Sequence, residues 1–162
     1  MPQSERHALV LGGGTMGVGI IAMFLGGGWK VDVVSRSAST RDGLPAATSR
    51  ALQAMGKSDD VSGLATYATL DEAPWSKIDI VVETVTEDLA LKQKIFADLE
   101  RLSRPGVPLT SNSSSFPISE IGKGLASDII ADELMRAGAH GVLVNLGGDL
   151  VFRGRTEDGS GW

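Results

Sequence analysis

The chain contains 162 residues, with a net charge of −5 at pH 7 and no cysteine. This length suits a single domain with a sizeable core. The acidic balance, with no cluster of basic residues, disfavours a nucleic-acid or anionic membrane partner. The lack of cysteine excludes disulfides, thiolate nucleophiles and cysteine-ligated metals, and we expect no metal site.

The longest uncharged stretch, residues 8–29, raises the question of a membrane span. Eight glycines interrupt it, and its apolar residues first run continuously and then recur at helical spacing. A strand, a glycine turn and a helix explain this pattern without a membrane segment. The first seven residues mix charge signs and lack a signal-peptide layout, so we expect a cytoplasmic protein.

The first half of the chain alternates between strand and helix patterns. Residues 8–11 are a short apolar run typical of a buried parallel strand. The helix that follows is expected to end at the three glycines 26–28. Further predictions are a strand over 29–34, a polar turn over 35–40, a helix over 44–55 and a short strand over 67–70.

An amphipathic helix follows the β-branched strand predicted over residues 78–82. Its expected apolar face carries leucine and isoleucine at positions 91, 95, 99 and 102, with Lys92 among the charged residues elsewhere. Glu87 and Asp88 are placed in its first turn, where carboxylates favour the helix dipole. A further strand is predicted over 107–110.

The last quarter of the chain adds a helix over 125–137, preceded by a helix start at Pro117, and a last strand over 141–146. Residues 153–162 are polar and glycine-rich and are expected to form a loose tail. The alternation of strands and helices predicts an α/β fold. It is a doubly wound, mainly parallel sheet in a single domain over residues 1–162.

A glycine loop joins the first predicted strand to the first predicted helix, with the sequence Gly12-Gly13-Gly14-Thr15-Met16-Gly17. It fits G-x-G-x-x-G in the strand-to-helix context that a Rossmann-like dinucleotide site requires. Gly12 allows a tight turn, Gly14 lets a pyrophosphate approach the backbone, and Gly17 lets the helix pack closely. The helix start, at Thr15 and Met16, offers unpaired N–H groups to phosphates. The alternative is a tight turn that binds nothing.

The residue after the second strand indicates which dinucleotide the loop would bind. NAD-binding domains usually have an acidic residue there to hold the ribose hydroxyls. Here the position is Ser35, followed by Arg36, while Asp32 falls inside the strand. A hydroxyl and a guanidinium suit a 2′-phosphate better than a free 2′-hydroxyl, so NADP and NAD are both candidates. A solvated surface arginine is the alternative reading of Arg36.

Three segments, in this order, resemble the 3-hydroxyacyl-CoA dehydrogenases. Residues 9–21 contain G-G-G-T-M-G-V-G-I, and residues 80–96 are close to the family's V-E-x-x-x-E-x-x-x-x-K. Residues 111–121 read S-N-S-S-S-F-P-I-S-E-I, similar to the family's S-N-T-S-S-x-x-I-x-E-I. The resemblance covers residues 7–121 and implies that family's NAD-binding domain.

By this resemblance, Glu87 and Lys92 would lie near the nicotinamide-ribose side of the cofactor. Ser114 would hydrogen-bond the 3-hydroxyl or 3-keto oxygen of the substrate. The residues alone also allow plainer roles. Glu87 would then favour a helix start, Lys92 would be a solvated helix lysine, and the serines would form a loop and cap.

The family's next motif, G-x-H-F-F-N-P, supplies the histidine that takes the substrate proton, and a glutamate soon after orients it. No segment here resembles this motif. His140 precedes a predicted strand, but no glutamate follows it before Glu157, and a loop role is expected for it. A complete catalytic centre is therefore not expected.

The tail resembles a second family, the FAD:protein FMN transferases, through Lys123-Gly-Leu-Ala-Ser-Asp128 and Asn145-Leu-Gly-Gly-Asp149. The resemblance implies that Lys123, Asp128 and Asp149 descend from a flavin site, although a helix start and a strand-end turn explain them as well. We interpret the chain as a chimera. Residues 1–121 are its dinucleotide-binding portion, and 122–162 are a grafted helix–strand portion.

Three hypotheses of function follow. The first is a recombined, engineered Rossmann-like domain that retains dinucleotide binding without turnover. The second is an NAD(P)-dependent 3-hydroxyacyl-CoA dehydrogenase with Ser114 and His140 as its polar centre. The third is a flavin-binding fragment, although FAD is not the expected cofactor. A homodimer would cover any apolar patch that the family's missing helical domain leaves exposed.

Overall fold

The structure is a computed structural model that describes residues 5–116, 121, 136, 141–146 and 149–154. Its elements are β1 (His7–Leu11), α1 (Thr15–Gly26), β2 (Lys30–Val34), α2 (Ala38–Ala54), β3 (Leu64–Tyr67), the 3-10 turn η1 (Leu70–Glu72), β4 (Ile78–Glu83), α3 (Leu89–Leu102), β5 (Leu109–Ser111), β6 (Gly141–Leu146) and β7 (Asp149–Gly154). Two compact units comprise Met1–Val85 with Leu102–Val107, and Thr86–Arg101 with Pro108–Trp162.

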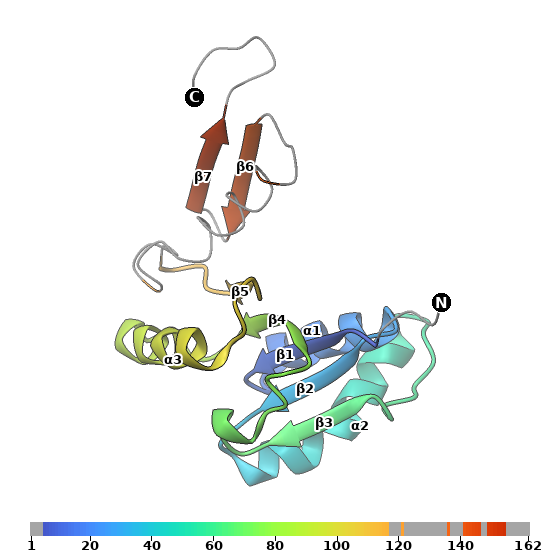
Figure 1. Cartoon of the computed structure of the whole chain (residues 1–162). Coiled ribbons are helices and arrows are strands. Elements are labelled where there is room, and N and C mark those ends of the chain that lie inside the picture. Colours follow the sequence, from blue (N-terminus) through green and yellow to red (C-terminus); the bar gives the residue numbers. More distant parts are fainter. Residues whose placement is uncertain (1–4, 117–120, 122–135, 137–140, 147–148, 155–162) are drawn as a thin grey trace. The chain divides into compact units, whose positions relative to one another are not determined.

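The five strands β1 to β5 form one sheet in the order β3-β2-β1-β4-β5 (Figure 1). β1 pairs in parallel with β2 on one side and β4 on the other, and β2 pairs in parallel with β3. The chain therefore reverses its direction of travel along the sheet after β3, as in doubly wound folds. The predicted Rossmann-like, mainly parallel α/β fold is confirmed.

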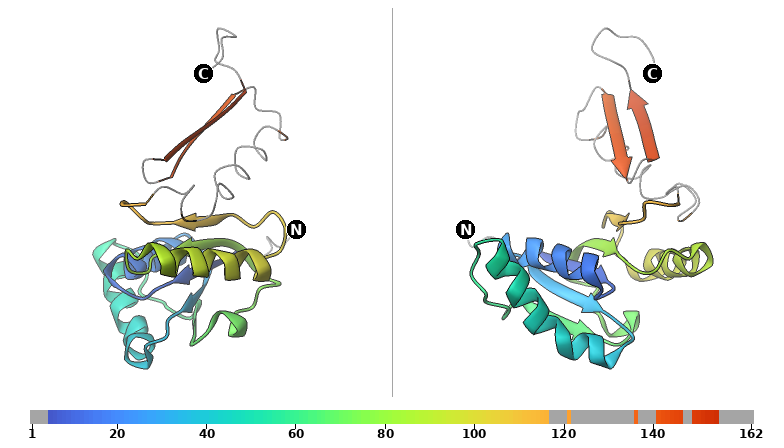
Figure 2. Two further views of the ribbon diagram at one scale, coloured as in Figure 1. Left: turned by 90° about the vertical axis from the view of Figure 1, so that its left-hand side faces the viewer. Right: turned by 180° about the vertical axis from the view of Figure 1, so that it is seen from behind.

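Helices α1 and α2 cover one face of the first unit's strands (Figure 2). The core beneath them is formed by buried aliphatic residues of both layers, namely Val10, Ile21, Val31, Val33 and Leu44. Val10 pairs in register with Val33, so their side chains lie on the same face. The apolar run of β1 thus holds the helices in place.

Two element boundaries in the first unit differ from the prediction. α2 begins at Ala38, inside the stretch expected to be a turn, because the Ser37 hydroxyl caps it by accepting the N–H of Thr40 at 3.2 Å. Pro45, near the start of the helix predicted over 44–55, lies in the interior of α2. β3 ends at Tyr67, where the predicted strand began. Pairing with β2 places it three residues earlier.

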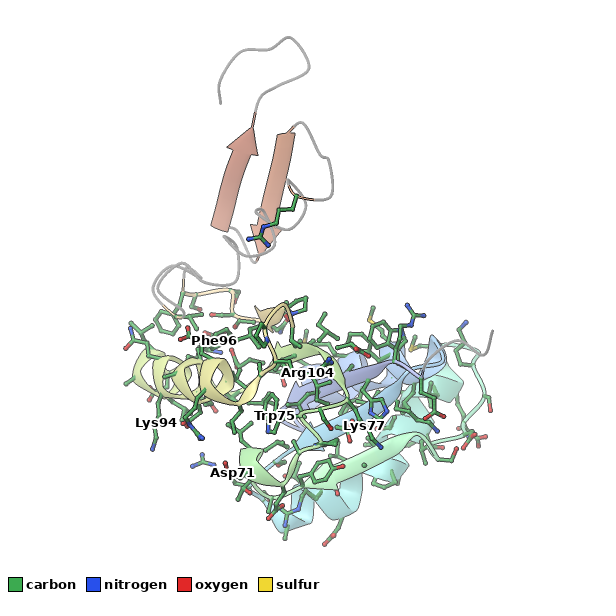
Figure 3. All side chains as sticks on the ribbon, viewed as in Figure 1. Asp71, Trp75, Lys77, Lys94, Phe96 and Arg104 are labelled. Carbon is green, nitrogen blue, oxygen red and sulfur yellow. The ribbon has the colours of Figure 1, made fainter. Side chains whose placement is uncertain are left out.

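The connection from β3 to β4 is held by two long side chains (Figure 3). The indole N–H of Trp75 donates to the carbonyl of Leu70 at 2.7 Å. The guanidinium of Arg104 donates to the carbonyl of Ile78 at 2.7 Å and lies 3.6 Å from Asp79. The first bond closes the loop before β4, and the second ties the start of β4 to the segment after α3.

A hydrogen-bonded chain of three polar side chains crosses β1, β2 and β3. Asp32 is 3% exposed, and its carboxylate accepts from Nδ1 of His7 and from the hydroxyl of Tyr67, both at 2.9 Å. A buried carboxylate needs such partners, because burial otherwise disfavours its charge. Asp32 thus has a structural role in the sheet, away from the loop where a ribose would bind.

Helix α3 buries a face that only partly coincides with the predicted one, since Leu99 is buried but Leu91, Ile95 and Leu102 are only partly so. Its buried residues are Lys92, Phe96 and Leu99, and Lys92 is fully buried. The interpretation of Lys92 as a solvated helix lysine is therefore wrong. Lys94, by contrast, is exposed and extends away from the helix (Figure 3). The helix is amphipathic as expected, but one of its cations lies on the buried face.

The last two strands form their own antiparallel pair, which runs from Gly141 opposite Gly154 to Leu146 opposite Asp149. The strand over 141–146 was expected, but its pairing was not. The five-stranded sheet does not include β6. β7 also occupies residues expected to form a turn and a loose tail.

No helix within the described residues is long and apolar enough to cross a membrane. The uncharged stretch 8–29 is instead divided among β1, the glycine loop and α1. The expected helix over 125–137 lies outside the described residues except for Arg136.

Titration of Tyr67 offers a test of the polar chain. Burial and the hydrogen bond to Asp32 raise the pKa of Tyr67 from its ordinary value of 10.0 to about 12. Its stabilising contribution is therefore complete below pH 10 and is lost as the pH rises towards 12. In urea unfolding at about pH 9 and about pH 11, Tyr67→Phe should lose less stability with rising pH than the parent.

At about pH 9, the same variant should be less stable by about 1 kcal/mol, because Asp32 loses one donor. Parallel pH profiles for the two proteins would show that Tyr67 does not bond to Asp32 in solution.

Candidate functional site

The glycine loop begins with a turn that requires glycine. Gly12 has a φ of +103°, a region that other residues rarely adopt. Its N–H donates to the carbonyl of Val34 at 3.0 Å, which joins the end of β1 to the end of β2. A Cβ at this position would lie 2.8 Å from Oγ1 of Thr84. The expected tight turn at Gly12 is present.

Gly17 permits the close approach of α1 to this turn. A Cβ on Gly17 would lie 2.2 Å from the carbonyl oxygen of Gly12, far inside van der Waals contact. Gly13 is similarly confined, because its Cβ would lie 2.7 Å from Cγ2 of Thr40 in α2. The sequence pattern G-x-G-x-x-G indicated the constraint at Gly17. It missed the constraint at Gly13, because the pattern allows any residue at that position.

Gly14 differs from its neighbours, because no atom lies within 4 Å of the position its Cβ would take. It is the N-cap of α1, with a φ of −74° and no side-chain cap. The next two residues, Thr15 and Met16, are exposed in the first helical turn. The first N–H groups of a helix lack partners within it, so this space fits a phosphate that approaches the backbone closely.

Thr84, which sequence reasoning missed, fastens the glycine loop to the end of β4. Its hydroxyl donates to the carbonyl of Leu11 at 2.8 Å and lies 3.3 Å from the carbonyl of Gly12. Its backbone N–H also donates to Leu11 at 2.8 Å. Only the adjacency of β1 and β4 could have revealed this role, because the residues lie 73 apart in sequence.

The end of β2 places Ser35 and Arg36 at the edge expected for a ribose. The N–H of Ser35 donates to the carbonyl of Tyr67 at 3.0 Å, and Arg36 is exposed. Arg41, a further residue that sequence reasoning missed, donates from its guanidinium to the carbonyls of Ser35 and Arg36. The turn after β2 is therefore held by a cation from α2.

In the second unit, Glu87 fixes the serine-rich loop after β5. Its carboxylate accepts from the hydroxyl of Ser113 at 2.7 Å and from the N–H of Ser114 at 3.3 Å. The Ser113 hydroxyl in turn accepts the N–H of Phe116 at 3.2 Å. Ser113 is buried, whereas Ser114 is exposed. The structure thus brings together Glu87 and Ser114, two of the residues expected to form a site.

Glu87 does not belong to the first turn of α3, as had been expected. The helix begins at Leu89, and Asp88 caps it by accepting the N–H of Leu91 at 2.9 Å. The interpretation of Glu87 as a residue that merely favours a helix start is therefore wrong. Its carboxylate interacts with the serine loop instead.

Several predicted positions lie outside the described residues, namely His140, Lys123 and Asp128. Asp149 is the first residue of β7. Within the described part of the chain, no three acidic or histidine side chains gather as a metal site would require.

A family model matches most of this chain. The family model described as "3-hydroxyacyl-CoA dehydrogenase, NAD binding domain" matches residues 7–130. That match extends past the expected junction near Gly122.

Solved structures show the same similarity. FadB2 of M. tuberculosis is 28% identical with a TM-score of 0.62, over 74% of this chain and 45% of that one. (S)-3-hydroxybutyryl-CoA dehydrogenase PaaH1 from Ralstonia eutropha is 26% identical with a TM-score of 0.62, over 73% and 44%. The 3-hydroxybutyryl-CoA dehydrogenase of Escherichia coli shares the fold at 24% identity and a TM-score of 0.63, over 73% and 26%. This chain thus spans less than half of each of these structures.

The contact between Gly17 and Gly12 predicts a large effect of one methyl group. Gly17→Ala should destabilise the protein by about 2–3 kcal/mol, because a backbone carbonyl cannot move aside as a flexible side chain can. Chemical unfolding would measure this. Gly19→Ala in the same helix is the matched control, since its Cβ would meet nothing within 4 Å. The control should gain about 0.5–1 kcal/mol. Equal stabilities for the two variants would contradict the close packing.

The bonds of Glu87 predict a local effect on the serine loop. Glu87→Ala should speed amide hydrogen exchange at Ser114 and Phe116, because one amide loses its acceptor and the other depends on the Ser113 hydroxyl that Glu87 holds. Glu100→Ala, which removes an exposed carboxylate from α3, is the control and should leave both amides unchanged. Unchanged exchange in Glu87→Ala would contradict the network.

Proposed function

The chain belongs to the NAD-binding domain family of the 3-hydroxyacyl-CoA dehydrogenases, and we propose that it binds NADP or NAD at the loop Gly12–Gly17 without turnover of its own. The observation that carries the proposal is the contrast among its glycines. Gly12 and Gly17 are confined by backbone atoms, whereas Gly14 faces open space at a helix start. Because no atom of the protein crowds this position, the lack of a side chain leaves the backbone open to the close approach of a phosphate.

The adenine-ribose end of the cofactor would lie at Ser35 and Arg36. An acidic residue is absent from this position, and Asp32 is bound to His7 and Tyr67 within the sheet. An exposed guanidinium attracts a 2′-phosphate, and no carboxylate is placed there to hold a free 2′-hydroxyl. We therefore propose that NADP binds more tightly than NAD.

The nicotinamide, when bound, would supply hydride transfer. A complete 3-hydroxyacyl-CoA dehydrogenase reaction is the second candidate function. The hydrogen bonds from the serine loop to Glu87 favour it, because they hold the backbone of Ser114 in a defined place. A histidine–glutamate pair is also needed for the proton, and the sequence after residue 121 contains no segment like G-x-H-F-F-N-P. Oxidation of 3-hydroxybutyryl-CoA above background would favour this second candidate.

We further propose that the last part of the chain, residues 131–162, is an addition of different origin, so that the junction lies after the family match and not near Gly122. Two observations support this: the family match stops at residue 130, and β6 and β7 pair only with each other within the described residues. A flavin function does not follow from this origin. FAD at millimolar concentration should leave the thermal unfolding temperature unchanged. A rise that Asp149→Ala abolishes would instead indicate a flavin site.

Substitution of Gly14 tests the binding proposal directly. Gly14→Ala should lower the affinity for NADP and NAD by about tenfold, or 1.4 kcal/mol, because its methyl group would fill the space left for the pyrophosphate. Its φ of −74° is open to alanine, so stability should change by about 1 kcal/mol or less. Isothermal titration calorimetry would measure the affinities, with Gly19→Ala as the control that binds normally.

Parent protein that unfolds cooperatively and binds neither dinucleotide would refute the proposal. Binding that Gly14→Ala leaves intact would show that the ligand lies elsewhere.

A further inference from the structure

Arg41 makes several of the hydrogen bonds that hold the turn after β2. Arg41 donates its backbone N–H to the carbonyl of Ser37 at 3.1 Å. Nη1 of its side chain donates to the carbonyl of Arg36 at 3.0 Å and also to the carbonyl of Ser35. Three consecutive carbonyl oxygens therefore accept hydrogen bonds from Arg41. The side chain of Arg41 is half-buried, as expected for a cation that donates hydrogen bonds to backbone carbonyls.

These hydrogen bonds reduce the electrostatic repulsion that the carbonyl oxygens of the turn would exert on an anion. A carbonyl oxygen carries a partial negative charge, so three of them near a phosphate would oppose its binding. Here all three carbonyl oxygens accept hydrogen bonds from N–H groups of Arg41, so their partial negative charges face this residue. The Ser37 hydroxyl is also engaged, because it accepts from the N–H of Thr40 and lies 2.9 Å from the Ser39 hydroxyl. Arg36, which is exposed, is then the charged side chain that the turn presents to solvent.

We propose that Arg41 is a positioning residue for the cofactor preference. By holding the carbonyls of Ser35 and Arg36 with its side chain, it sets the backbone from which Arg36 meets a 2′-phosphate. The inference rests on the proposed dinucleotide site and names a residue that determines its specificity. Arg41 acts through the backbone of Arg36. Nη1 of Arg41 is engaged by the two carbonyls, while Nη2 and Nε still carry N–H donors, so direct contact of Arg41 with the phosphate is the alternative that the variants below must distinguish.

A double-mutant cycle separates these two roles. NADP and NAD would be titrated calorimetrically into the parent, Arg36→Ala, Arg41→Gln and the double variant. Each single change should weaken NADP by about tenfold and NAD by about twofold or less. In the double variant the second change should add little, because Arg41 acts through Arg36. Losses that multiply in the double variant would overturn the proposal, since they would mean independent contacts with the phosphate.

Two further variants separate positioning from simple charge. Arg41→Lys keeps the charge, but its ammonium ends one bond short of Nη1, so it should bind NADP as poorly as Arg41→Gln. Arg50→Gln removes an exposed arginine from the same helix, about 13 Å further along its axis, and should bind NADP as the parent does. The proposal would be overturned if Arg41→Lys bound NADP as tightly as the parent, or if Arg50→Gln bound NADP as weakly as Arg41→Gln.

A measurement without ligand completes the test. Amide exchange at Ser35, whose N–H bonds to Tyr67 at 3.0 Å, should become faster in Arg41→Gln and stay unchanged in Arg36→Ala. Unchanged exchange in Arg41→Gln would show that Arg41 does not hold the turn, and the inference would fail while the binding site stood. A parent protein that binds neither dinucleotide would overturn both.

Discussion

The approach of Gly17 to the carbonyl oxygen of Gly12 determines where the first helix can begin. Gly17 has no side chain to overlap that oxygen, and this allows α1 to start directly against the end of β1. The left-handed turn at Gly12 and the hydroxyl of Thr84 brace the loop from the other side. The start of the helix therefore has a fixed direction, and its free N–H groups have a fixed place. Phosphate binding by backbone alone depends on such rigidity.

At the carboxyl end of β2, the acidic side chain bonds within the sheet, and the basic side chains lie at the turn that follows. The carboxylate that the strand does contain, Asp32, bonds to His7 and Tyr67 and so belongs to the sheet. The turn beyond it contains Ser35 and Arg36, and Arg41 of α2 holds its backbone. This division gives the turn a positive character without a buried unpaired charge.

The second unit shows how a loop of small polar residues can be made rigid. Ser113 is buried and bonded to Glu87, and Ser114 takes its backbone direction from the same carboxylate. Exposed serines are otherwise among the more mobile residues of a protein. The carboxylate thus performs a positioning role that a helix-start interpretation would not require.

The sequence alone was sufficient for the fold class and the glycine loop. Both depend on local patterns: a strand's apolar run, a helix's spacing and the glycines between them. It also placed Glu87 and Ser114 among the site residues, but only through likeness to a family. Only the tertiary structure could decide which face α3 buries, where β3 pairs, and that β6 pairs with β7. These choices depend on partners distant in the chain. The roles of Thr84, Gly13 and Arg41 were hidden for the same reason, since each is defined by an atom that folding brings near.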